Sequence, residues 1–126
     1  MIKLKRVYEP VASDDGPRFL VERLWPRGFK KAELEMHAWL KDVAPSGKLR
    51  QWFNHDPEKW KEFRERYFRE LRASPDAVDP VITAAKQGTI TLLYSSRDTE
   101  HNNAVALRDY IQKQWKKRRK LTGEQL

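Results

Sequence analysis

The chain contains no cysteine among its 126 residues. Disulfide bonds, cysteine-ligated zinc, iron–sulfur clusters and thiol nucleophiles are therefore excluded. No stretch approaches the ~20 consecutive apolar residues that a membrane-spanning helix needs. The first six residues alternate between apolar and basic, and no continuous apolar segment follows them as it would in a signal peptide. We therefore expect a soluble protein that makes no membrane contact, is not exported and resides in the cytoplasm.

Nucleotide-binding glycine loops and metal-binding signatures are also missing. Neither Gly-x-Gly-x-x-Gly nor a P-loop occurs, which excludes nucleotide binding through those loops. A metal site built from His55, His101 and nearby carboxylates has no supporting spacing such as His-Glu-x-x-His. The sequence therefore identifies no cofactor and no metal.

The charge of the chain is positive but unevenly distributed. The net charge is +8, from 26 basic and 18 acidic residues. Residues 113–126 hold six bases and one acid, which leaves 20 bases and 17 acids in residues 1–112. The body is nearly balanced, so a general nucleic-acid-binding surface is not favoured. The basic run over 116–120 either contacts phosphates or is a solvated helix end.

Apolar periodicity predicts a single α/β domain over residues 1–115, followed by a basic tail over 116–126. Strands are expected at 2–8, 18–24 and 89–94. Helices are expected near 31–41, around Leu49 to Phe53, after Asp56-Pro57-Glu58, over 76–87 and from about Glu100 onward. Helices then separate the last two strands, which is typical of a short, mostly parallel sheet with helices packed around it.

Two polar motifs follow two of the predicted strands. The first is Glu22-Arg23-Leu24-Trp25-Pro26-Arg27-Gly28, and the second runs from Ser95 through Asn102. The carboxyl ends of parallel strands share one edge of a sheet, and ligands bind in the crevice there. We therefore expect these two motifs, about 70 residues apart, to converge on one site.

The residue types in these motifs favour an anion site. Arg23, Arg27 and Arg97 offer forked, permanently charged donors for a carboxylate or phosphate. Ser95, Asn102 and His55 are further candidates for ligand binding, and the N-terminus of the last helix is expected nearby. If the protein catalyses a reaction, the candidate acid–base residues are Glu22, Asp98 and His101.

Each assignment has a structural alternative. Asp98 is also a candidate helix cap, and Asp56 is a candidate cap that would make His55 part of a helix lead-in. Arg23 and Arg97 are alternatively structural ion-pair partners. Trp25 and Pro26 are more typical of packing and turns than of a ligand platform.

Three blocks of the sequence resemble a known family. They are Leu20 to Gly28, Leu49 to Pro57 and Leu93 to Asn103, and together they spread the resemblance over residues 1–115. The Trp-Pro-Arg-Gly and Arg-Asp-x-Glu-His-Asn segments resemble the YeaO-like family (domain of unknown function 488). Similar sequences usually carry Asp at the position of Glu22. The resemblance implies a small α/β fold with Rossmann-like layering and implies no activity.

Three functional hypotheses follow from these observations. The first is a site for a small phosphate- or carboxylate-bearing molecule such as a nucleotide, with catalysis undecided. The second is a nucleic-acid-binding module that uses the tail and the arginine edge, and the third is a non-catalytic protein-interaction domain. The sequence leaves the ligand and the oligomeric state open.

Overall fold

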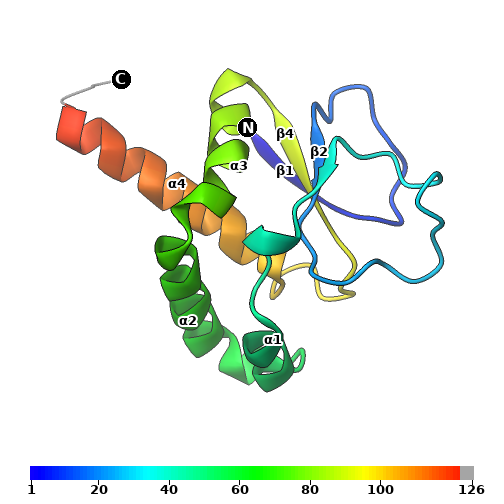
Figure 1. Ribbon diagram of the computed structural model, residues 1–126, viewed down its shortest axis with the longest axis horizontal. Coiled ribbons are helices and arrows are strands. Elements are labelled where there is room, and N and C mark those ends of the chain that lie inside the picture. The colour runs from blue at the N-terminus through cyan, green and yellow to red at the C-terminus, as the bar shows by residue number, and fades with distance from the viewer. Residues whose placement is uncertain (123–126) are drawn as a thin grey trace.

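A computed structural model of the chain describes residues 1–122, with side chains through residue 117 (Figure 1). Its four strands form one parallel sheet in the order β1-β4-β2-β3. The strands are β1 (Ile2–Arg6), β2 (Arg18–Leu20), β3 (Ala38–Trp39) and β4 (Ile90–Tyr94). The helices are η1 (Lys41–Val43), α1 (Gly47–Phe53), η2 (Pro57–Lys59), α2 (Trp60–Ala73), α3 (Pro75–Gln87) and α4 (Asn103–Thr122), where η denotes a 3-10 helix. The expected small α/β domain with a parallel sheet is confirmed.

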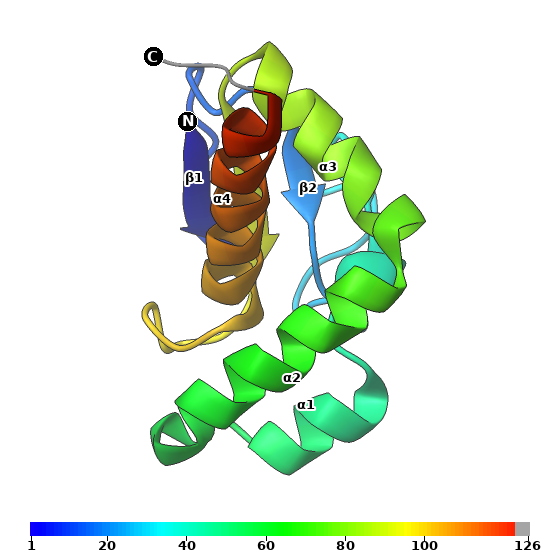
Figure 2. The same ribbon diagram turned by 90° about the vertical axis from the view of Figure 1, so that its left-hand side faces the viewer.

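Within residues 1–122, helices cover only one face of this sheet. Phe19 and Leu92 point into a large core cluster with residues of α2, α3 and α4. Leu20 and Leu93, which follow them in the chain, point to the other face, because successive strand residues alternate. Buried residues of that second cluster come from strands and connecting segments, including Leu34. Figures 1 and 2 accordingly show helices on one side of the strands and long connections on the other.

The prediction of a helix near 31–41 is wrong. Over this stretch the chain turns, adds strand β3 at the edge of the sheet and then forms η1. The backbone N–H of His37 donates to the carbonyl of Arg18 (2.6 Å), and that of Leu40 donates to the carbonyl of Leu20 (2.9 Å). Because β2 takes these donors, they are not available for helical hydrogen bonds. Leu34 packs into the second cluster, where it covers the sheet in place of a helix.

Other predicted elements hold with shifted ends. The first two strands stop at Arg6 and Leu20, earlier than the predicted residues 8 and 24. The N–H of Val21 still donates to the carbonyl of Leu93 at 3.3 Å, after which the chain leaves β4. The last helix begins at Asn103 because the side chain of Asn102 caps it by accepting from Val105 N at 3.0 Å. The Asp56 cap is confirmed, since its Oδ1 accepts from Glu58 N at 3.0 Å.

The buried carboxylate of Asp15 attaches the β1–β2 connection to the face of the sheet that the helices do not cover. Asp15 is 1% exposed and accepts hydrogen bonds from Lys3, Lys5 and Arg18, and from the N–H of Ala12. Burial raises the pKa of the Asp15 carboxyl, but these hydrogen bonds outweigh burial and hold the pKa well below its usual range. The carboxylate therefore stays ionised and contributes stability that is lost only in acid.

No helix in the described part of the chain is long and apolar enough to cross a membrane.

Gly16, beside that carboxylate, provides the sharpest test of the connection. Its φ of +63° lies in the left-handed region, and an added Cβ would sit 1.9 Å from the carbonyl oxygen of Thr89. We expect Gly16→Ala to lower the free energy of unfolding by about 2 kcal/mol or more, because the left-handed conformation alone costs about 1–2 kcal/mol. Gly47→Ala is the matched control, since no atom lies within 4 Å of its added Cβ. Equal denaturation midpoints for the two variants would contradict the placement of this connection.

Candidate functional site

The two polar motifs meet at the carboxyl edge of the sheet, as their placement predicted. Glu22 Oε1 accepts hydrogen bonds from Ser95 N at 2.7 Å and from Ser95 Oγ at 3.1 Å. Glu22 follows β2 and Ser95 follows β4, and these strands are neighbours. A carboxylate that accepts two donors from the adjacent strand end joins the two motifs directly.

Side chains from other segments hold the chain around Glu22. Trp39 Nε1 donates to the carbonyl of Glu22 at 2.7 Å, and Asn103 Nδ2 donates to the carbonyl of Val21. The guanidinium of Arg23 donates from Nε to the carbonyl of Pro45 at 3.0 Å, and from Nη2 to that of the preceding residue at 3.2 Å. The segment after β2 is therefore positioned by β3, by the start of α4 and by the lead-in to α1.

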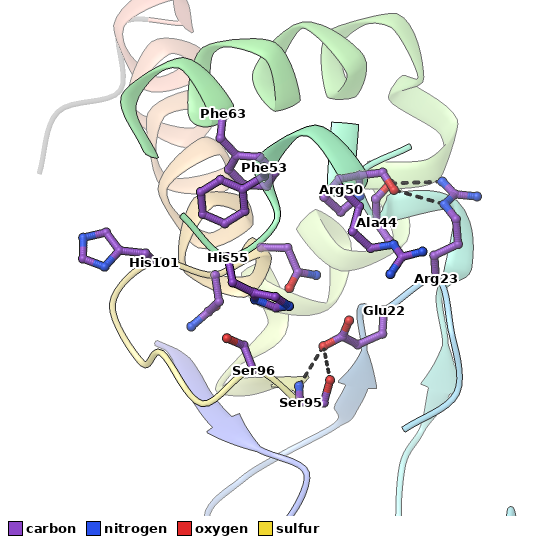
Figure 3. A pocket seen from close by; sticks show the side chains of 13 residues that line it. Glu22, Arg23, Ala44, Arg50, Phe53, His55, Phe63, Ser95, Ser96 and His101 are labelled. Atoms are coloured by element: carbon purple, nitrogen blue, oxygen red, sulfur yellow. Dashed lines mark hydrogen bonds between the residues drawn. The ribbon is translucent and has the colours of Figure 1, made fainter. Parts of the chain in front are cut away.

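A cavity of about 70 Å³ opens beside this contact, and we call it the edge pocket (Figure 3). One wall includes Phe53 and Phe63, whose rings stack with centroids 4.3 Å apart. The pocket is lined by Glu22, Arg23, Ala44, Pro45, Arg50, Phe53, His55, Phe63, Ser95, Ser96, His101, Asn102 and Asn103. The pocket thus lies between polar groups of the sheet edge and residues of the helical layer, which include the two aromatic rings.

Glu22 is the acidic residue of this lining. Burial raises the pKa of its carboxyl above the usual range, while the two hydrogen bonds from Ser95 and the charges of Arg50 and His55 oppose that rise. Its Oε1 is occupied by Ser95, whereas Oε2 accepts no hydrogen bond within the described part of the chain. Glu22 therefore presents one engaged and one open oxygen.

The turn after α1 brings two groups to the pocket from the helical layer. Asn54 and His55 both have left-handed backbone, with φ of +47° and +54°. Asn and His tolerate this region better than most residues, and the bend carries His55 to the pocket rather than onward along the helix. Arg50 lies one turn earlier on α1, and Figure 3 shows its guanidinium directed toward Glu22.

The prediction that Asp98 caps the last helix is wrong, because α4 begins at Asn103 with Asn102 as its cap, and Asp98 instead closes the turn before the helix. Its Oδ1 accepts from Glu100 N and His101 N, both at 2.9 Å, and its Oδ2 lies 3.0 Å from Nδ1 of His101. The backbone hydrogen bond from Glu100 is the largest influence that lowers the pKa of the Asp98 carboxyl. The paired His101 lines the pocket and packs edge-on against Trp60, with ring centroids 5.4 Å apart. Asn102 is 3% exposed and caps α4.

The structure does not bring every predicted ligand-binding arginine into the pocket. Arg23 lines it, but its guanidinium is engaged by the two carbonyls before α1. Arg27 and Arg97 are exposed and lie outside the lining. Of the other predicted residues, the pocket gathers Glu22, Ser95, His55, His101 and Asn102.

Sequence reasoning missed two arginines at this edge. Arg6 ends β1 and donates to the backbone carbonyls of Ser96 (2.9 Å) and Ser95 (3.3 Å), so it braces the loop after β4. Arg6 also lies at the carboxyl end of a parallel strand, so the argument that selected the residues after β2 and β4 applies to it as well. Arg50 had no such signal, because a charged residue on an exposed helix face resembles ordinary solvated surface.

The described residues contain no group of three or more histidine and carboxylate side chains able to hold a metal ion.

Comparisons with known proteins agree over nearly the whole chain. A family model described as "Inactive DUF488-N3 subclade" matches residues 1–125. The uncharacterized protein YeaO of Escherichia coli K12 is 41% identical over 110 residues, which cover 87% of this chain and 96% of that relative. The uncharacterized protein Rv3073c of Mycobacterium tuberculosis H37Rv is 38% identical over 106 residues, which cover 84% of this chain and 89% of that relative. No solved structure gives a significant match.

Substitution of Asp98 separates stabilisation of the turn before α4 from a role in chemistry. We expect Asp98→Ala to lower the free energy of unfolding by about 1 kcal/mol, because two backbone N–H groups lose their acceptor. Asp98→Asn retains an acceptor oxygen and should recover most of that loss. Urea denaturation of the three proteins measures the difference. If the alanine variant is as stable as the wild type, Asp98 does not stabilise the turn and its carboxylate is available for another role.

Proposed function

The chain belongs to the DUF488 family, as its three sequence blocks predicted, and on that premise we propose that it binds a compact anionic molecule in the edge pocket without transforming it. The ligand carries a carboxylate or phosphate group. The observation that carries this proposal is the charge balance of the lining. Two permanently charged side chains, those of Arg23 and Arg50, line the pocket together with a single carboxyl group, that of Glu22.

Arg50 is the group best suited to hold the anion. Its guanidinium makes no hydrogen bond or ion pair with any residue in the described part of the chain. By contrast, Arg23 is engaged by backbone carbonyls and Arg6 braces the loop after β4. An arginine donates through several N–H groups in a planar fork, which matches the oxygens of a carboxylate or phosphate. Ser96 and His55 add hydrogen-bonding groups on the same lining.

Several features support binding rather than catalysis. Asp98 is engaged by two backbone N–H groups and by His101, which is the arrangement of a side chain that stabilises a turn. Ser95 directs its hydroxyl to Glu22 Oε1, and no histidine of the described chain hydrogen-bonds to it as an activating base would. The description of the matched subclade as inactive agrees with this view. Glu22, Asp98 and His101 are then positioning and binding residues.

Thermal melting with inorganic phosphate and with small carboxylates tests the proposal. A ligand that binds the native state raises the melting temperature, and at about 100 times its Kd it adds about 2.7 kcal/mol of stability. We expect at least one of these anions to stabilise the wild type and to lose that effect in Arg50→Ala. Arg50 is exposed, so the variant should fold without ligand.

Arg97→Ala and Arg27→Ala are the matched controls for Arg50→Ala. Each removes the same charge from an exposed site outside the pocket, so each should respond to the anion as the wild type does. Equal loss of the effect in all three variants would show nonspecific attraction to a basic protein and refute the pocket. An effect that disappears only when Lys116 and Lys117 are replaced would favour the nucleic-acid hypothesis instead.

A further inference from the structure

The open Oε2 oxygen of Glu22 determines which group a ligand of the edge pocket should place next to it. Oε1 already accepts from Ser95 N at 2.7 Å and from Ser95 Oγ at 3.1 Å. Oε2 has no donor among the described residues, and the half-buried Glu22 lines the cavity. A carboxylate oxygen accepts hydrogen bonds from water, and a ligand that displaces this water loses affinity unless it supplies a donor in its place. A well-matched ligand therefore presents a hydrogen-bond donor at the Glu22 end.

The other end of the pocket favours a hydrogen-bond acceptor on the ligand. Arg50 and His55 act electrostatically on Glu22, yet neither forms an ion pair with it. Figure 3 shows Glu22 at the sheet edge, with Arg50 and His55 opposite it. The guanidinium of Arg50 requires an acceptor, ideally a charged one. The pocket thus separates a site for a donor from a site for an anion.

The size of the cavity limits the distance between these two ligand groups. A water molecule needs roughly 10–15 Å³ of such volume, so about 70 Å³ encloses about five to seven non-hydrogen atoms. That is too little to enclose a nucleotide. The stacked rings of Phe53 and Phe63 form an apolar wall, which suits a short hydrocarbon body between the two polar ends.

We propose that the edge pocket selects compact acids that carry a hydrogen-bond donor next to the acidic group, which is the class of small amino and hydroxy acids. The acid group binds Arg50 and His55, and the amino or hydroxyl group donates to Glu22 Oε2. This assignment rests on the proposed function, since it names the ligand class for the same pocket.

Three small acids with the same number of non-hydrogen atoms test the assignment. Glycine carries an ammonium group, glycolate carries a hydroxyl group, and propionate carries a methyl group in the same place. We expect glycine or glycolate to bind the wild type at least about tenfold more tightly than propionate, a difference of about 1.4 kcal/mol. Isothermal titration calorimetry measures each Kd, and inorganic phosphate serves as the anion without a hydrocarbon body.

Glu22→Gln is the variant that tests the role of the open oxygen. Its amide oxygen can still accept from Ser95, while its NH₂ group replaces the open acceptor with a donor. We expect the variant to lose the preference for glycine or glycolate and to bind propionate as the wild type does. Its melting temperature without ligand reports whether the fold is retained, and the comparison of the three acids on the wild type stands without the variant.

The outcomes separate this assignment from the proposed function. If propionate binds as tightly as glycine and glycolate, or if only phosphate binds, the ligand class is overturned while anion binding stands. If the preference exists but persists in a folded Glu22→Gln variant, Glu22 does not select the donor and the assignment is overturned. If neither phosphate nor any of the acids binds, the proposed function fails as well.

Discussion

The contact between Glu22 and Ser95 is the interaction on which the rest of the site depends. It joins the segment after β2 to the loop after β4 at the edge where both strands end. The backbone of the first segment is held from the other side by Trp39 and Asn103, and Arg6 holds the backbone of the second. Because each partner comes from a different element, the pocket exists only when the whole domain is folded.

The layering of the domain explains why the pocket lies where it does. Helices α2, α3 and α4 occupy one face of the sheet, and the helical layer extends past the carboxyl edge to carry α1 and its left-handed turn (Figure 2). The opposite face is covered by the two long connections, one fastened by the ion pairs of Asp15 and the other by the packing of Leu34. The edge pocket therefore forms where the sheet edge meets the overhanging helical layer.

Much of this arrangement follows from sequence patterns that have a direct physical basis. Helix α2, the cap at Asp56 and strand β4 were predicted because each depends on neighbouring residues. The convergence of Glu22 and Ser95 followed from the geometry of parallel strands. Strand β3 was missed because its backbone pairs with β2, and local preference does not reveal such a partner. Arg50 lines the pocket and Arg97 does not, and the sequence could not separate them, because this difference depends on the placement of α1 beside the sheet edge.

Mapping of backbone amide chemical shifts by NMR tests the central claim most directly, because it locates the bound anion without a variant. Titration with phosphate and with glycolate at neutral pH should move the amide signals of Glu22, Arg50, His55, Ser95 and Ser96, which surround the edge pocket. The amides around Arg27 and Lys116 should stay unchanged by comparison. Shifts confined to Arg27, Arg97 and the lysines of α4, with the pocket residues unmoved, would contradict the account and show that the anion binds the exposed basic surface.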